Sequence, residues 1–262
     1  MSAPDIGMGI GTGSGTPVAV AHPVEYRRVY VWELPVRLYH GINAVCLVGL
    51  CITGYLIGAP MRATVAPEAY QLYWFGWVRF LHFACAFIWI FNFAARIYWG
   101  FVGNRYASWA SFFPLKKSQR QEIVDVVKAD VLETKLHGPI STGHNALAGL
   151  IYFFTFLAFV FQTITGLALY SNMSTSPLPR MFNWIVPLMG GEFQVRFWHH
   201  LFLWFFVSFI IVHIYLAFYH DYIEGRGTIS SIVGGWKFDR QSPEQMAAAC
   251  KLIEKPDADK QK

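Results

Sequence analysis

The amino-acid sequence predicts an all-α integral membrane protein in which four transmembrane helices form a bundle. Hydrophobic residues make up 55% of the 262 residues and charged residues only 14%, whereas a soluble domain carries about 25% charged residues. Four long apolar runs follow one another, and basic residues gather on one side of them. A soluble core cannot cover this much apolar surface, so the lipid bilayer is an expected partner. The net charge of +5 is then an orientation signal, not a sign of nucleic-acid binding.

The four spans are expected at about residues 38–60, 72–99, 143–170 and 197–220. The first and last runs hold 24 residues without a charge, which as a helix cover about 36 Å, enough for one bilayer crossing. The second run contains Arg79 near its start and Arg96 near its end. Both side chains are expected to reach the headgroups. The transmembrane domain as a whole is expected to cover residues 26–238.

The flanking segments indicate the orientation. Residues 1–25 carry no Lys or Arg and no continuous apolar core, so they are expected to form a flexible cytoplasmic tail instead of a signal peptide. Residues 117–136 are expected to form a surface helix, and residues 239–262 a polar cytoplasmic tail. An even number of spans places both ends on one side, which holds seventeen Lys and Arg residues against four on the other. The positive-inside rule therefore predicts that both termini are cytoplasmic.

Histidine is the ionisable residue that recurs inside the expected spans, which contain no Asp or Glu. The histidines well inside the spans are His40, His82, His199, His200 and His213, and His144 and His220 lie near span boundaries. Ionisable groups within a membrane are costly and indicate a functional site. A single buried histidine, however, is more often a hydrogen-bonded structural residue. The spacing between the histidines is therefore needed to distinguish ligands from structural residues.

The spacing favours two pairs of histidines. His199 and His213 are 14 residues apart, which places them on nearly one helix face and about 21 Å apart along the axis. His200 is rotated by about 100° from His199 and points elsewhere. The topology places His40 at the depth of His213 and His82 at the depth of His199. We call His40 with His213 the inner pair, and His82 with His199 the outer pair.

Two neutral imidazoles facing each other suit the axial ligation of haem iron, whereas zinc requires four ligands. The sequence therefore predicts two b-type haems with His40, His82, His199 and His213 as iron ligands. Arg37, Arg79 and Arg196 each precede one of these histidines by three residues, and residues i and i+3 share a helix face. Each guanidinium is expected to bind a haem propionate, the alternative being plain contact with headgroups.

The dipeptides Thr53-Gly54 and Thr165-Gly166 form a weak internal repeat. Glycine at these positions allows a close approach of another helix or of a macrocycle, and ordinary helix packing is the simpler interpretation.

The sequence resembles the b-type cytochrome subunit of membrane-bound nickel–iron hydrogenases, a family related to the cytochrome b subunit of formate dehydrogenase. Two motifs carry the resemblance, which covers roughly residues 26–238. They are Arg37-Leu-Tyr-His40 followed by Ile52-Thr53-Gly54, and Arg196-Phe-Trp-His199-His200-Leu201 followed by Trp204 and His213. Gly41 departs from the family, which usually has Trp after the first ligand, so the local packing at the inner haem is expected to differ from the family's.

The resemblance implies a multi-pass subunit in the bacterial cytoplasmic (inner) membrane. Such a subunit anchors a periplasm-facing hydrogenase and takes electrons from its iron–sulfur small subunit, which connects to the large nickel–iron subunit. The electrons pass through two b haems to the quinone pool. Asn145 resembles an asparagine that contacts the quinone in related subunits. The expected quinone-binding residues beside the inner pair are His144, Asn145, His220 and Tyr222, although His144 and Asn145 could simply cap a helix.

Two alternatives remain open at this point. The cytochrome subunit of a formate dehydrogenase-like complex would have the same four helices and haem sites. The protein that copurifies with this chain would distinguish such a complex from a hydrogenase. A haem-free transporter is disfavoured because proton-coupled carriers place carboxylates within the membrane. The four cysteines show no CxxC spacing, so no iron–sulfur, zinc or hydrogen-activating site is expected in this chain.

Overall fold

The computed structural model describes residues 26–59, 73–113, 117–132 and 143–240. Residues 28–239 form one compact unit, and the other unit, residues 1–27 and 240–262, lies almost wholly outside the described residues. The tail expected at residues 1–25 and nearly all of the tail expected at residues 239–262 therefore lie outside the described residues.

Four helices of the described chain are long and apolar enough to cross a membrane. They are α1 (Leu34–Gly58), α2 (Trp74–Val102), α4 (Ala146–Ser171) and α7 (Glu192–Glu224). The largest difference from the expected spans is in α7, which continues beyond residues 197–220 at both ends. Its 33 residues cover about 50 Å, more than the hydrocarbon core of about 30 Å. A helix need not end where the apolar run ends, because charged residues continue it into the headgroup region.

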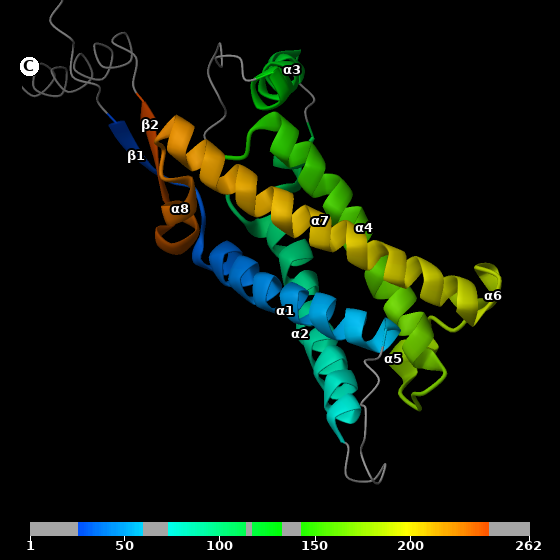
Figure 1. Cartoon of the computed structure of the whole chain (residues 1–262). Helices are drawn as coiled ribbons and strands as arrows, with labels where there is room; N and C mark the ends of the chain where they lie inside the picture. The colour runs from blue at the N-terminus through cyan, green and yellow to red at the C-terminus, as the bar shows by residue number, and fades with distance from the viewer. Residues whose placement is uncertain (1–25, 60–72, 114–116, 133–142, 241–262) are drawn as a thin grey trace, which may run out of the picture. The chain divides into compact units, whose positions relative to one another are not determined.

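The long helices share one core (Figure 1). In that unit α1 packs along α2, and α7 contacts both α1 and α4. The buried core cluster draws on all four helices and consists of Cys46, Leu47, Trp89, Phe93, Ala158, Phe159 and Phe206. Within it, the Phe159 ring stacks on Phe206 and meets Trp89 edge-on, each with 5.0 Å between centroids. On α7, the cluster residue Phe206 lies between His199 and His213, which are expected to bind the two haems.

Short elements surround the ends of the long helices. Strand β1 (Tyr26–Tyr30) pairs with β2 (Trp236–Arg240) in a two-stranded sheet. The other short elements are η2 (Trp109–Phe112), α3 (Lys117–Leu132), α5 (Pro177–Arg180), α6 (Ile185–Leu188) and α8 (Thr228–Gly234). In Figure 1, α8 lies where α1 begins and α7 ends, whereas α5 and α6 lie at the end where α7 begins.

Glu33 ties the start of α1 to the end of α2. Pro35 occupies the first turn of α1, a position that suits proline because the first amides of a helix have no acceptor within it. The Glu33 carboxylate accepts hydrogen bonds of 2.9 Å from the Trp99 indole and from the Asn104 amide. These bonds hold the segment before His40 in place.

The expectation that Arg96 reaches the headgroups is wrong. Its side chain is only 8% exposed, and the guanidinium donates a 3.0 Å hydrogen bond to the Ala107 carbonyl. It also lies over the Tyr39 and Trp109 rings. The chain after α2 folds back and offers a carbonyl and aromatic faces, which replace water as partners of the buried cation.

Candidate functional site

The inner pair, His40 on α1 and His213 on α7, comes together in the structure. The two ring centroids are 6.3 Å apart, and the ring planes are inclined by 49°. Two imidazoles that bind one metal ion at about 2 Å each place their centroids about 6 Å apart. The observed centroid distance of 6.3 Å is close to this value, so it is compatible with two imidazoles that hold one metal ion.

The Tyr152 hydroxyl of α4 lies 3.3 Å from Nδ1 of His213, and Phe209 stacks on the same imidazole at 5.4 Å. A partner at Nδ1 leaves Nε2 of His213 available to a metal. Reasoning from the sequence did not identify Tyr152, because a tyrosine in an apolar run has no distinctive spacing.

The outer pair, His82 on α2 and His199 on α7, is held by two threonines. Nδ1 of His82 lies 2.9 Å from the Thr53 hydroxyl of α1, and Nδ1 of His199 lies 2.9 Å from the Thr165 hydroxyl of α4. The two histidines lie close enough to interact electrostatically. All four long helices thus contribute to the outer site.

Gly54 and Gly166, the residues after these threonines, lie against the same imidazoles. A Cβ atom on Gly54 would lie 3.4 Å from Cε1 of His82, and a Cβ on Gly166 would lie 3.2 Å from Cε1 of His199. Both helices therefore approach the rings closely because they lack side chains there. A hydroxyl at each Nδ1 leaves both Nε2 atoms as donors that could hold a metal, and each Thr-Gly dipeptide supplies both the hydroxyl and the close backbone contact.

His200 differs from its neighbour His199. Its Nδ1 lies 3.3 Å from the Arg196 carbonyl, and a Cβ on Gly58 of α1 would lie 1.8 Å from its Nε2. The ring therefore rests directly on the α1 backbone. No space for a macrocycle remains beside that nitrogen.

The three arginines expected to bind propionates have partners near the helix ends. The Arg37 guanidinium donates to the Val233 carbonyl, and that of Arg79 lies 3.1 Å from the Met173 sulfur. The exposed guanidinium of Arg196 lies 3.9 Å from the Glu192 carboxylate. A propionate role for these residues stays a prediction.

The residues expected to bind quinone have different surroundings in the structure. Asn145 is the N-cap of α4, and its side-chain oxygen accepts a 2.7 Å hydrogen bond from the Ala148 amide. His220 pairs with Glu224, with 3.1 Å between the imidazole nitrogen and the carboxylate. Tyr222 is 90% exposed.

His144 lies between aromatic rings of the inner end. Its ring centroid is 4.7 Å from that of Trp32 and 4.8 Å from that of Tyr152. Its Nδ1 is buried and has no hydrogen-bond partner among the described residues. Burial first, and then the cationic Lys237 and Arg96, lower the pKa of His144 to about 3. The imidazole is therefore neutral at physiological pH.

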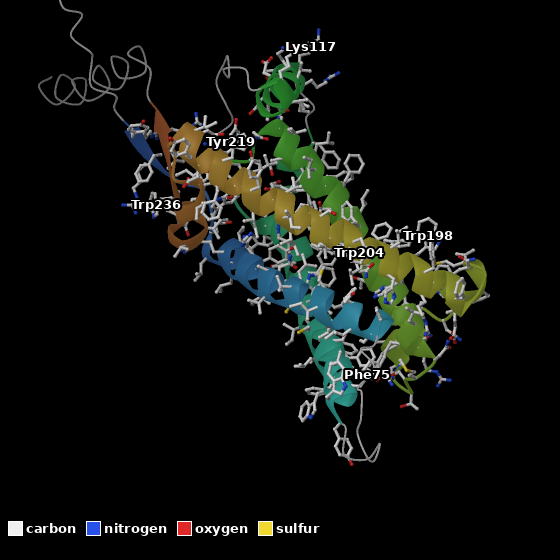
Figure 2. All side chains as sticks on the ribbon, viewed as in Figure 1. Phe75, Lys117, Trp198, Trp204, Tyr219 and Trp236 are labelled. Carbon is white, nitrogen blue, oxygen red and sulfur yellow. The ribbon has the colours of Figure 1, made fainter. Side chains whose placement is uncertain are left out.

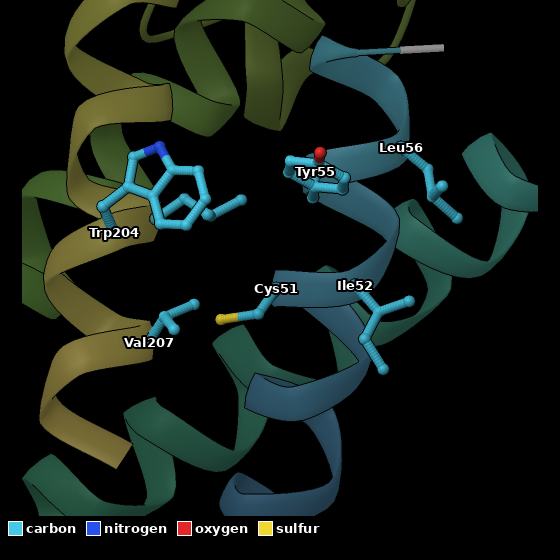
Figure 3. Close-up of a pocket in the computed structure, with 7 residues that line it drawn as sticks. Cys51, Ile52, Tyr55, Leu56, Trp204 and Val207 are labelled. Atoms are coloured by element: carbon cyan, nitrogen blue, oxygen red, sulfur yellow. The ribbon is translucent and has the colours of Figure 1, made fainter. Parts of the chain in front are cut away.

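An apolar pocket of about 340 Å³ lies between α1 and α7 (Figure 3). Its lining residues are Cys51, Ile52, Tyr55, Leu56, Leu203, Trp204 and Val207. Figure 2 shows Trp204 between Trp198 and Tyr219 along α7. The lining contains none of the four predicted ligands, so this pocket lies beside the histidine pairs and does not include them.

Comparison with known proteins places the chain among membrane cytochromes. Residues 31–235 match the family described as prokaryotic cytochrome b561. A protein of Azotobacter chroococcum is 38% identical over 80% of this chain and 88% of its own length. Proteins of Cupriavidus necator (36% identical, 90% of this chain, 97% of its own length) and Escherichia coli K12 (34%, 79% and 90%) are also similar. All three are named as Ni/Fe-hydrogenase B-type cytochrome subunits.

Proposed function

The chain belongs to the prokaryotic cytochrome b561 family, and we propose that it is the membrane anchor and electron-transfer subunit of a nickel–iron hydrogenase complex. In this role it passes electrons from the iron–sulfur small subunit to the quinone pool of the bacterial inner membrane, with both termini in the cytoplasm.

One observation supports this function above the others. Helix α7 carries His199 and His213 about 21 Å apart along its axis, and each lies near a histidine of another helix. At the inner pair the imidazole centroids are 6.3 Å apart. At the outer pair the imidazoles are held by threonines and flanked by glycines. Two such sites at different depths suit electron transfer across a membrane.

His40 with His213 and His82 with His199 would each hold one b haem through their imidazoles. When bound, each haem supplies a one-electron redox centre whose potential depends on its ligands and their hydrogen bonds. The core cluster between the sites excludes water from the interior. His200 is left out of the ligand set because its ring packs on the α1 backbone at Gly58.

Quinone is proposed to bind beside the inner pair, at the start of α4. Asn145 and His144 lie there, and Tyr152 links this region to His213. The amide of Asn145 can donate a hydrogen bond to a quinone oxygen while its side-chain oxygen continues to cap the helix. His220 remains a second polar group at this level. Tyr222, whose side chain is 90% exposed, is the most exposed of these proposed contacts.

The test is the haem content of the purified chain and of four single variants. The parent protein should bind two b haems with resolved reduction steps in a reduced-minus-oxidised spectrum. Replacing His82 or His199 with Ala should remove the outer haem and leave the inner one, and replacing His40 or His213 should do the reverse.

A parent protein without haem would contradict the proposal. A crossed pattern, in which His40 and His199 variants lose the same haem, would show that the pairing is wrong. Copurification with a formate dehydrogenase in place of a hydrogenase would overturn the proposed partner.

A further inference from the structure

The outer pair contains a feature that axial ligation alone does not require. Both of its imidazoles have a threonine hydroxyl at Nδ1, and both distances are 2.9 Å. The two threonines come from different helices, α1 and α4, and both are buried, with Thr53 7% and Thr165 0% exposed. The same arrangement thus occurs twice in one site.

The direction of these hydrogen bonds follows from the second neighbour of each hydroxyl, which is a backbone carbonyl. The Thr53 hydroxyl lies 2.6 Å from the Gly49 carbonyl, and the Thr165 hydroxyl lies 2.9 Å from the Phe161 carbonyl. A carbonyl can only accept, and a hydroxyl has a single proton, so each threonine donates to its own helix. Its oxygen is then an acceptor toward the histidine, and the imidazole must carry its proton on Nδ1.

A proton on Nδ1 leaves Nε2 unprotonated, which is the form that binds a metal. A ligand imidazole that donates from its other nitrogen is also more basic and held at a fixed orientation. A more basic axial ligand favours the oxidised over the reduced iron, which lowers the reduction potential.

We infer that Thr53 and Thr165 are positioning residues that fix the tautomer of His82 and His199 and lower the reduction potential of the outer haem. This inference rests on the proposed haem ligation at the outer pair. Each threonine acts through the imidazole whose Nδ1–H hydrogen bond its hydroxyl accepts, and not through direct contact with the iron.

The experiment compares Val and Ser at both positions in the full-length chain purified from membranes. Thr53→Val and Thr165→Val keep the shape of the side chain but remove the hydroxyl, whereas Thr53→Ser and Thr165→Ser retain it. Thr155→Val is the matched control, because Thr155 is a buried α4 residue whose hydroxyl also donates to a carbonyl of its own helix, that of Ile151 at 2.9 Å, but accepts from no histidine among the described residues. The readouts are haem content and the midpoint potential of each haem, with the outer haem assigned by its loss in His199→Ala.

Each Val variant should raise the potential of the outer haem and leave the inner haem unchanged. Loss of one hydrogen bond should change the ratio of reduced to oxidised outer haem at a fixed potential by about two- to tenfold. For a one-electron couple the upper value corresponds to a shift of about 59 mV. The Ser variants should keep the parent potential, and Thr155→Val should change neither haem. The double Val variant should show roughly the sum of the two shifts, since the hydroxyls share no partner.

Loss of the outer haem in the Val variants, with retention and parent potential in the Ser variants, would also support the inference. Val variants that bind both haems with an unchanged outer potential would overturn it, as would equal shifts or equal haem loss in the Ser and Val variants. These results would leave the proposed function standing. A parent chain without haem would overturn both.

Discussion

At the scale of single residues, adjacent positions in one helix have separate roles because their side chains meet different neighbours. His199 meets a threonine hydroxyl and a glycine, whereas His200 meets a backbone. Asn145 caps α4 with its oxygen and keeps its amide protons for another partner. These contacts lead to three predictions.

The first prediction concerns the histidine doublet. His200→Ala should retain both haems and their potentials, because Nε2 of His200 faces the α1 backbone at Gly58 and not an open site. Haem content per chain and the reduced-minus-oxidised spectrum provide the measurement, with His199→Ala as the matched control that loses the outer haem. Loss of a haem in His200→Ala would show that the wrong histidine of the doublet has been assigned.

The second prediction separates the cap of Asn145 from its proposed contact with quinone. Asn145→Ser keeps an N-cap acceptor of similar strength but lacks the amide donor, so it should slow quinone reduction about two- to tenfold at unchanged thermal stability. Asn145→Leu should slow it as well and also lose about 0.5–2 kcal/mol of stability. Rates are measured with both haems loaded and reduced by hydrogen. An Asn145→Ser variant with the parent rate would remove Asn145 from the quinone site.

The third prediction concerns His144 and pH. Burial, and then Lys237 and Arg96, lower its pKa from 6.5 to about 3, so below pH 6.5 the unfolded chain binds a proton that the folded chain excludes. The free energy of unfolding should therefore decrease as pH falls below about 6.5, by up to about 2 kcal/mol at pH 5. Thermal unfolding of the parent and of His144→Gln at pH 7 and pH 5 tests this. An equal loss of stability in both proteins would mean that His144 is not the group responsible.

At the scale of elements, close approach of helices depends on glycine. Gly58 near the end of α1 meets the His200 ring of α7, and Gly54 meets Leu203 of α7 and His82 of α2. Without side chains there, α1 can pack against two helices, and the outer site is assembled from both contacts. The helix α7 connects this site to the inner one, because it carries one histidine of each pair.

A fourth prediction tests the α1–α7 contact at Gly58. Gly58→Ala places a methyl group 1.8 Å from Nε2 of His200, so the ring must move or the helices must separate, at a cost of about 1–3 kcal/mol. Adding His200→Ala should restore most of the lost stability by providing the space. Unfolding temperatures of the two single variants and the double variant measure the coupling. If the double variant were no more stable than Gly58→Ala, the contact with His200 would not be the cause of the lost stability.

At the scale of the whole molecule, the end of the compact unit where α7 begins presents apolar side chains to its surroundings. Trp184, Leu188 and Phe193 are 60%, 71% and 77% exposed. In the predicted topology this is the periplasmic end, next to the outer pair, and it is where the hydrogenase small subunit is proposed to dock. The centre of a protein–protein interface is typically apolar and poor in charged residues. The other outer connection, residues 59–72, lies almost wholly outside the described residues.

The fifth prediction follows from this docking surface. Leu188→Glu or Phe193→Glu should weaken association with the hydrogenase and slow haem reduction by hydrogen by about tenfold, while dithionite still reduces both haems. Val233→Glu is the matched control, because Val233 is 79% exposed but lies in α8, at the opposite end of the compact unit. Full hydrogen-dependent reduction in the Leu188 and Phe193 variants, or crosslinks from the hydrogenase to the α8 end, would place the partner elsewhere.

The sequence by itself determined the four apolar helices, because the cost of placing charges in lipid leaves long runs without them. It also determined which histidines share a face of α7, since helical geometry converts a spacing of 14 residues directly into angle and depth. The family followed from the motifs around Arg37 to His40 and Arg196 to His213.

Only the tertiary structure decided what each polar group faces. Arg96 turns inward because a loop after α2 offers it a carbonyl and aromatic rings, and nothing in the spacing along α2 encodes that loop. The threonines meet the outer histidines because residues 29 and 34 positions apart come together only when different helices pack. Helical periodicity specifies the face on which a side chain lies, but the partner on that face depends on long-range packing, which residue spacing within one helix does not contain.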